Sequence, residues 1–114
     1  MIKSSYNESA EFNEDRVALK VILETEFSKE IRILLKKGQE MREHKAPFPI
    51  IVHLLDGSID FGVEGKNNRL QKGDILTLKS NVPHNLIAKV DSMVRLTLSK
   101  RDSTDRVEDV IKKH

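Results

Sequence analysis

Clusters of turn residues interrupt this chain at intervals of roughly 8–12 residues through most of its length. The clusters are Gly38, 46–49, Asp56-Gly57, 64–68, 72–74, 79–83 and Asp91-Ser92. Segments this short accommodate a strand, whereas an ordinary helix needs about three uninterrupted turns. The spacing therefore predicts a closed or sandwiched antiparallel all-β domain.

Apolar and polar residues alternate within the segments that the turns delimit. In 30–37, Ile31, Ile33 and Leu35 share one face, while Arg32 and Lys36 lie on the other. A period of two is typical of a half-buried strand. Further strands are predicted at 17–24, 41–44, 50–55, 58–63, around residue 70, and at 75–78, 84–90 and 93–99. The Asp56-Gly57 pair between two of these predicts a hairpin turn.

Only the end of the chain has a helical pattern. Val107, Val110 and Ile111 recur at helical spacing in 103–114, and Ser103 or Thr104 is suited to cap the start. A short helix docked on the sheet is expected, with a frayed tail as the alternative. The predicted organisation is an N-terminal arm (1–15), partly disordered or swapped, a barrel (16–100), and a C-terminal helix or tail (101–114).

Composition excludes several classes of function. The chain has 114 residues and no cysteine, which rules out disulfides, zinc fingers and thiol catalysis. A net charge of +2, one tyrosine and no tryptophan argue against nucleic-acid binding. No apolar run is long enough to span a membrane. The polar first residues lack the apolar core of a secretory signal, so the cytoplasm is the expected location.

Two glycine-histidine motifs lie in the middle of the chain. In the first, Gly38, His44 and Gly57 keep the spacing of the first cupin motif, while Ala46 and Ile50 replace its second histidine and its glutamate. In the second, Gly73, Asp74 and His84 keep the pattern. The departures there are Lys79 for proline, Asn81 for glycine and Ala88 for asparagine.

The stretch from Gly38 to Ala88 thus resembles the cupin family of small jelly-roll barrels. The ending Val82-Pro83-His84 is typical of small cupins. The resemblance implies an all-β double-stranded β-helix, to which the C-terminal helix is appended.

The resemblance also implies a metal site inside the barrel, where three histidines and a glutamate hold iron, manganese, nickel, copper or zinc. His44 and His84 occupy two of those four positions. Glu40, which shares strand parity with His44, and His53 are the candidate third ligands. His53 faces away from Ile50 unless a bulge follows Pro49. The sequence leaves open whether a metal binds.

A pocket follows from the same parity. If Ile50 faces inward, as the resemblance implies, so do other apolar residues of the predicted strands. The candidate lining residues are Ile50, Val52, Leu54, Phe61, Leu96 and Leu98. Arg42 shares the parity of His44 and is a candidate contact for an anionic ligand. A mainly apolar pocket with a few polar points is the usual composition of a small-molecule site.

Three functions are compatible with these features. The first, which we favour, is a module that binds or senses a small molecule. The second is a metal-dependent enzyme of the dioxygenase or isomerase type that uses His44, His84 and a further ligand. The third is a non-catalytic dimeric structural or interaction protein. A homodimer is expected in each case, because small cupins generally dimerise and edge strands such as 17–24 can pair.

Overall fold

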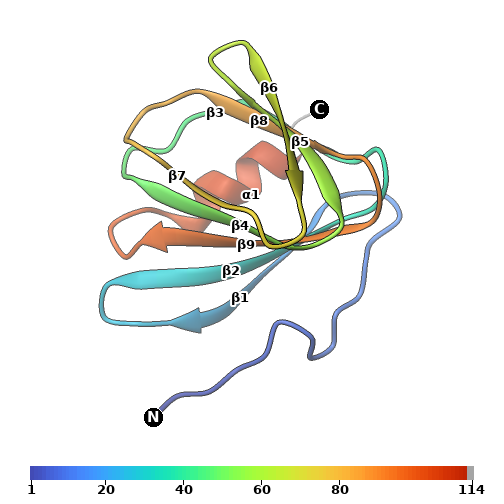
Figure 1. The fold of residues 1–114 in the computed structure, drawn as a ribbon. Coiled ribbons are helices and arrows are strands. Elements are labelled where there is room, and N and C mark those ends of the chain that lie inside the picture. Colours follow the sequence, from blue (N-terminus) through green and yellow to red (C-terminus); the bar gives the residue numbers. More distant parts are fainter. Residues whose placement is uncertain (113–114) are drawn as a thin grey trace.

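A computed structural model describes residues 1–112 of the chain, which form nine strands and one helix (Figure 1). The strands are β1 (Ala18–Glu24), β2 (Ser28–Leu35), β3 (Glu40–His44), β4 (Ile50–Asp56), β5 (Ser58–Val63), β6 (Lys66–Gln71), β7 (Ile75–Leu78), β8 (His84–Ala88) and β9 (Ser92–Ser99). The helix is α1 (Thr104–Lys112). The other strands fall on segments predicted from alternation and turn residues, but β6 begins at Lys66, inside the predicted turn cluster 64–68.

The strands form two antiparallel sheets that face one another (Figure 1). Sheet A has the order β1-β2-β9-β4-β7, and sheet B has the order β3-β8-β5-β6. From β3 onward the chain passes repeatedly from one sheet to the other. The prediction of an all-β, cupin-type jelly roll with a short C-terminal helix is confirmed.

The core lies between the two sheets. In β9 the residues at alternate positions are buried, which is the period expected for a strand with one inner face. The inward-facing apolar residues of both sheets include Ile31, Ile33, Leu35, Val52, Leu54, Ile59, Phe61, Leu86, Ala88, Val94, Leu96 and Leu98.

The turn at Gly57 is not the predicted hairpin. β4 belongs to sheet A and β5 to sheet B, so the chain crosses between the sheets there. Gly57 has a φ of +98°, and the Oγ of Ser92, the first residue of β9, accepts a hydrogen bond from the Ser58 N–H at 3.1 Å. The local residues suit a tight bend in either topology, so they could not distinguish the two. A two-residue hairpin does occur at Glu64-Gly65, between β5 and β6.

The N-terminal arm folds over the outer face of sheet A. The guanidinium of Arg32 in β2 donates hydrogen bonds to the carbonyl oxygens of Tyr6, Glu8 and Ser9, at 3.0, 2.9 and 3.3 Å. Arg32 is 4% exposed, and nearly all of β2 is buried on both faces. The free-energy cost of burying this charged side chain is offset by its hydrogen bonds to three carbonyl oxygens.

Helix α1 covers the edge of the sandwich beside β3 (Figure 1). The Asp105 N–H donates to Ser103 Oγ at 3.1 Å, so Ser103 caps the helix as the sequence indicates. Val107, Val110 and Ile111 are buried, which confirms the apolar stripe. Lys113 and His114, which the predicted helix included, lie outside the described residues. Within residues 1–112, no helix has the length and apolar character needed to cross a membrane.

The close packing at Gly57 generates a prediction about stability. A Cβ at Gly57 would lie 2.7 Å from both the Asp91 carbonyl oxygen and Ser92 Cα, whereas one at Gly65 would meet nothing within 4 Å. Both glycines have positive φ, so Gly65→Ala is the matched control. Gly65→Ala should lower the free energy of unfolding by about 1–2 kcal/mol through backbone strain alone. Gly57→Ala should cost about 1–3 kcal/mol more through overpacking. Urea denaturation measures both, and equal costs would contradict the packing argument.

Candidate functional site

A small cavity lies between the two sheets and beneath α1. Its volume is ≈ 20 Å³, which leaves room for about one water molecule. The lining residues come from both sheets and from the helix: Ile33, Met41, His44, Ile50, Val52, Phe61, His84, Leu86, Val94, Leu96, Arg106 and Val107. The wall is thus mainly apolar, with two imidazoles and one guanidinium as its strongly polar groups.

The two histidines of the sequence motifs meet at this cavity. His44 ends β3 and His84 begins β8, and the ladder between these strands pairs them directly. Their ring centroids are 4.2 Å apart, with the ring planes tilted by 60°. The Phe61 ring, from β5, lies nearly parallel to His84 with centroids 5.7 Å apart. Three neighbouring strands of sheet B therefore fix the position of the pair.

Hydrogen bonds to the backbone determine the tautomer of each ring. His44 Nδ1 lies 2.7 Å from the Arg42 carbonyl oxygen, and His84 Nδ1 lies 2.9 Å from the Val82 carbonyl oxygen. A carbonyl oxygen only accepts, so each Nδ1 carries a proton and donates it. In the neutral rings, the Nε2 atoms are then left with lone pairs. They are the strongest acceptors among the lining side chains.

Both rings are neutral at physiological pH. Burial lowers the pKa of His44 to about 4, and the nearby positive charge of Arg106 contributes in the same direction. Burial also lowers the pKa of His84, with Arg106 again contributing. A titratable group strongly perturbed by desolvation in a cavity is a candidate functional group.

Arg106 enters the cavity wall from α1. Its Nε and Nη2 atoms each donate to Asp102, at 2.9 Å, in a two-pronged ion pair. The Asp102 side chain is 1% exposed and also accepts the Ser103 N–H at 2.7 Å. Arg106 Nη1 makes a longer contact of 3.4 Å with the Lys45 carbonyl oxygen. The guanidinium is therefore held in one orientation at the start of α1.

The polar residues of β3 lie differently from the parity expectation. The ladder between β3 and β8 shifts between Met41 and His44, so the strand does not alternate regularly there. Met41 and His44 both line the cavity, whereas Arg42 and Glu40 are exposed and do not line it. Arg42 instead contacts the Val110 carbonyl oxygen of α1 at 3.5 Å.

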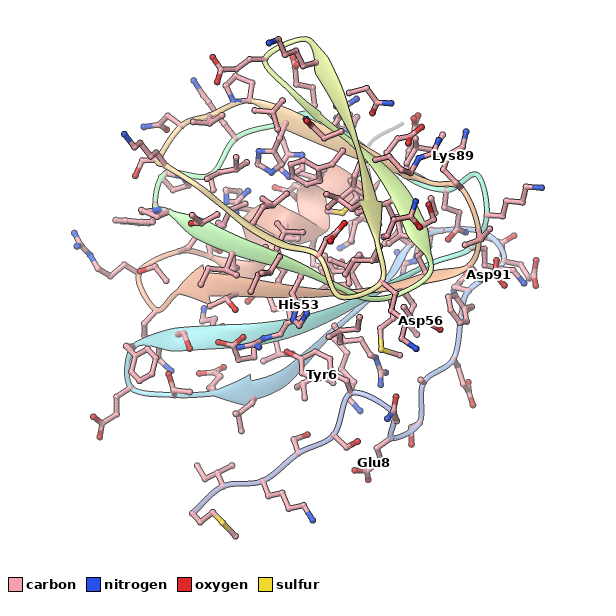
Figure 2. All side chains as sticks on the ribbon, in the orientation of Figure 1. Tyr6, Glu8, His53, Asp56, Lys89 and Asp91 are labelled. Atoms are coloured by element: carbon pink, nitrogen blue, oxygen red, sulfur yellow. The ribbon has the colours of Figure 1, made fainter. Side chains whose placement is uncertain are left out.

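The other sequence-derived candidates divide into three groups. The cavity lining includes Ile50, Val52, Phe61 and Leu96. Leu54 and Leu98 are fully buried but pack in the core away from the cavity. His53 lies on the outer face of sheet A, on the side of the N-terminal arm and Tyr6 (Figure 2), and its buried Nδ1 has no hydrogen-bond partner within residues 1–112.

Comparison with known proteins agrees with this architecture. The family model described as "Cupin domain" matches residues 31–99, which is more than half of the chain. The chain belongs to the cupin family. No curated protein sequence matches this cupin.

Several solved structures share its fold at low sequence identity. An RmlC-like cupin from Desulfovibrio desulfuricans has a TM-score of 0.76 and 23% identity, covering 87% of this chain and 96% of that one. An RmlC-like cupin from Shewanella frigidimarina has a TM-score of 0.76 and 16% identity, covering 94% and 96%. KdgF from Halomonas sp. has a TM-score of 0.73 and 18% identity, covering 88% and 94%.

The metal site implied by the family does not fit the residues present in this cupin. Ala46 and Ile50, at two of the four ligand positions, are buried and offer no donor. Glu40 and His53 face away from the His44–His84 pair. Across residues 1–112, no cluster of three or more histidine or acidic side chains has a metal-binding arrangement. Two imidazoles alone are an incomplete ligand set for a transition metal.

Several lining residues escaped the sequence reasoning. Ile33 and Val94 lie on predicted strands with the correct parity, so the alternation alone could have identified them. Met41 required knowledge of the bulge. Arg106 and Val107 required the docked position of α1, which local sequence does not specify.

The depressed pKa of His44 predicts a pH-dependent stability. The unfolded chain protonates this histidine near its ordinary value of 6.5, whereas the folded protein resists protonation down to about 4. As the pH falls from 6.5 towards 4, the unfolded state binds more protons, so the free energy of unfolding should decrease. His44→Gln should flatten this slope. His53→Gln, on the outer face of sheet A, is the control. Urea denaturation between pH 4 and pH 7 measures the slopes, and an unchanged slope in His44→Gln would refute the assignment.

Proposed function

We propose that this cupin binds a small organic molecule between its two sheets, with His44 and His84 as the recognition residues. The observation that carries the proposal is the pair of neutral imidazoles, each fixed through Nδ1, in an otherwise apolar wall. A ligand O–H or N–H group can donate a hydrogen bond to either Nε2 atom, because each is an acceptor in the neutral ring.

The chemistry of the wall favours recognition over turnover. Neutral imidazoles accept a hydrogen bond from a hydroxyl or N–H group, and the surrounding Val, Ile, Leu and Phe side chains contact an apolar body. No acidic side chain lines the cavity within the described part of the chain, so no orienting carboxylate assists either imidazole as a base. We therefore favour a binding or sensing role above a metal-dependent dioxygenase or isomerase.

A thermal-shift screen with site variants tests the proposal. The probes are small hydroxy acids, sugars and aromatic acids, because these combine hydroxyl donors with apolar groups. A ligand of the folded state present at 100 times its Kd should add about 2.7 kcal/mol of stability and raise Tm. His44→Gln and His84→Gln should each weaken binding by about tenfold or more, through loss of a buried hydrogen bond. His53→Gln should leave binding unchanged.

Elemental analysis of dialysed protein without a histidine tag distinguishes the metal-dependent enzyme from the small-molecule-binding module. We expect well under one equivalent of zinc, iron, manganese, nickel or copper per chain, because only two donors are present. A full equivalent that disappears in His84→Gln would favour the metal-dependent enzyme. If no probe raises Tm and no metal is found, the results would count against both the binding module and the metal-dependent enzyme. They would favour the interaction protein.

We further infer that the protein is a homodimer that pairs through the part of the outer face of sheet A that the N-terminal arm leaves exposed. Three large apolar side chains are exposed on this face, namely Phe27 at 77%, Ile51 at 38% and Ile75 at 62%. A surface groove joins Phe27 and Ile51, and β1, next to Phe27, is an edge strand of sheet A. Apolar side chains grouped on one face are typical of contact surfaces between protein chains.

Light scattering tests the homodimer. The wild type should give twice the mass of one chain. Ile51→Arg should shift the equilibrium towards the monomer, because it places a charge at the centre of the apolar face. Val90→Arg, at another exposed apolar position, should remain dimeric. A monomeric wild type at working concentration would contradict the proposal without affecting the ligand site.

A further inference from the structure

Arg106 gives the cavity its electrostatic character. Among the lining side chains in residues 1–112, it carries the only formal charge, since both imidazoles are neutral. A charge at an apolar wall acts in a low dielectric and is weakly screened. Asp102 offsets this charge on one edge of the guanidinium, so a ligand carboxylate would be attracted to the Nη1 side.

The orientation of Arg106 leaves room for a second acceptor. Asp102 takes one edge of the guanidinium, through Nε and Nη2. Within residues 1–112, the Nη1 side has only the 3.4 Å contact with the Lys45 carbonyl oxygen, which is at the weak end of hydrogen-bond lengths. A ligand carboxylate would give Nη1 a shorter, charge-assisted partner. Asp102 would then act as a positioning residue, because it holds the guanidinium while the ligand binds.

The cavity has to widen before it can hold a ligand larger than water. The present volume accommodates about one water, so a molecule of four or more carbon atoms needs a larger space. The lining strands are tied by ladder hydrogen bonds to their neighbours. Helix α1 belongs to neither sheet and follows β9 through only a short connection, residues 100–103. It is therefore the lining element that can be displaced while both sheets stay intact.

We propose that α1 opens and closes the cavity, and that Arg106 on this helix binds the carboxylate of a small carboxylic acid. The proposal rests on the ligand-binding function inferred above and adds the ligand class. The acid would place its apolar body against the aliphatic wall and a hydroxyl group at the His44–His84 pair. Closure of α1 would bring Arg106 to the carboxylate, so binding and closure would be coupled.

Calorimetric titration with a matched pair of probes tests this assignment. The probes are 2-hydroxyisobutyrate and 2-hydroxyisobutyramide, which share shape and hydroxyl group and differ in charge. The wild type should bind the acid about tenfold or more tightly than the amide. Arg106→Gln should bring the two affinities to within about twofold, while amide binding is kept. Arg106→Lys should retain part of the preference, because the charge remains without the two-pronged geometry.

The controls separate recognition from structure. Arg101→Gln removes a neighbouring cation that lies over the Phe48 ring, 4.7 Å from its centroid, and should keep the wild-type acid preference. A purely structural Arg106 would lower Tm but leave the acid-to-amide ratio unchanged, and that result would overturn the proposal. Equal binding of acid and amide by the wild type would also overturn it, while the ligand-binding function would stand. Binding of neither probe, with no response in the wider screen, would overturn both.

Discussion

The contact between Gly57 and Ser92 fixes the two sheets relative to one another, and the site depends on it. Ser92 is 1% exposed, and its Oγ bonds both to the Ser58 N–H and to the Val90 carbonyl oxygen. Two crossings, β4 to β5 and β8 to β9, therefore meet at one point. Since β5 and β8 are paired strands, this junction also holds β8 in register. That register places His84 opposite His44 at the far end of the strand.

In each imidazole of the site, one ring nitrogen, Nδ1, donates a hydrogen bond to the backbone. The other, Nε2, remains a hydrogen-bond acceptor. Each Nδ1–H bonds to a backbone carbonyl two residues earlier, so the cost of burying that donor is offset locally. Burial then holds the pKa of both rings low, and a neutral pair tolerates the nearby Arg106 without charge repulsion. The same desolvation that makes the rings neutral thus permits a cation in the cavity wall.

The positions of most strands were predictable where alternation and turn residues agreed, whereas their order and pairing were not. The two histidines could be brought together only from the resemblance to cupins. Local chemistry could not decide what the bend at Gly57 connects, because a crossing and a hairpin use the same residues there. The parity of Arg42 and Glu40 was misjudged because one shift in the β3 ladder reverses every side chain beyond it. Arg106 reaches the cavity only through the docked position of α1. The apolar stripe of the helix predicts that it docks on the sheet, but not where.

The docking of α1 on the barrel limits the affinity of the cavity for its proposed ligand. A helix of nine residues is unstable in isolation, so its position depends on its contacts with the barrel. Val107, Val110 and Ile111 pack against the barrel, each worth at most about 1.5–3 kcal/mol on full burial. Arg42 also contacts the Val110 carbonyl oxygen, and Arg106 contacts the Lys45 carbonyl oxygen. If binding requires an open state populated to a fraction f, the observed Kd is the intrinsic Kd divided by f. When α1 closes over a bound acid, the free-energy cost of opening is recovered only through contacts that the empty cavity lacks. Such a contact can form on the Nη1 side of Arg106. Selectivity for the ligand would then reside in the helix as much as in the histidine pair.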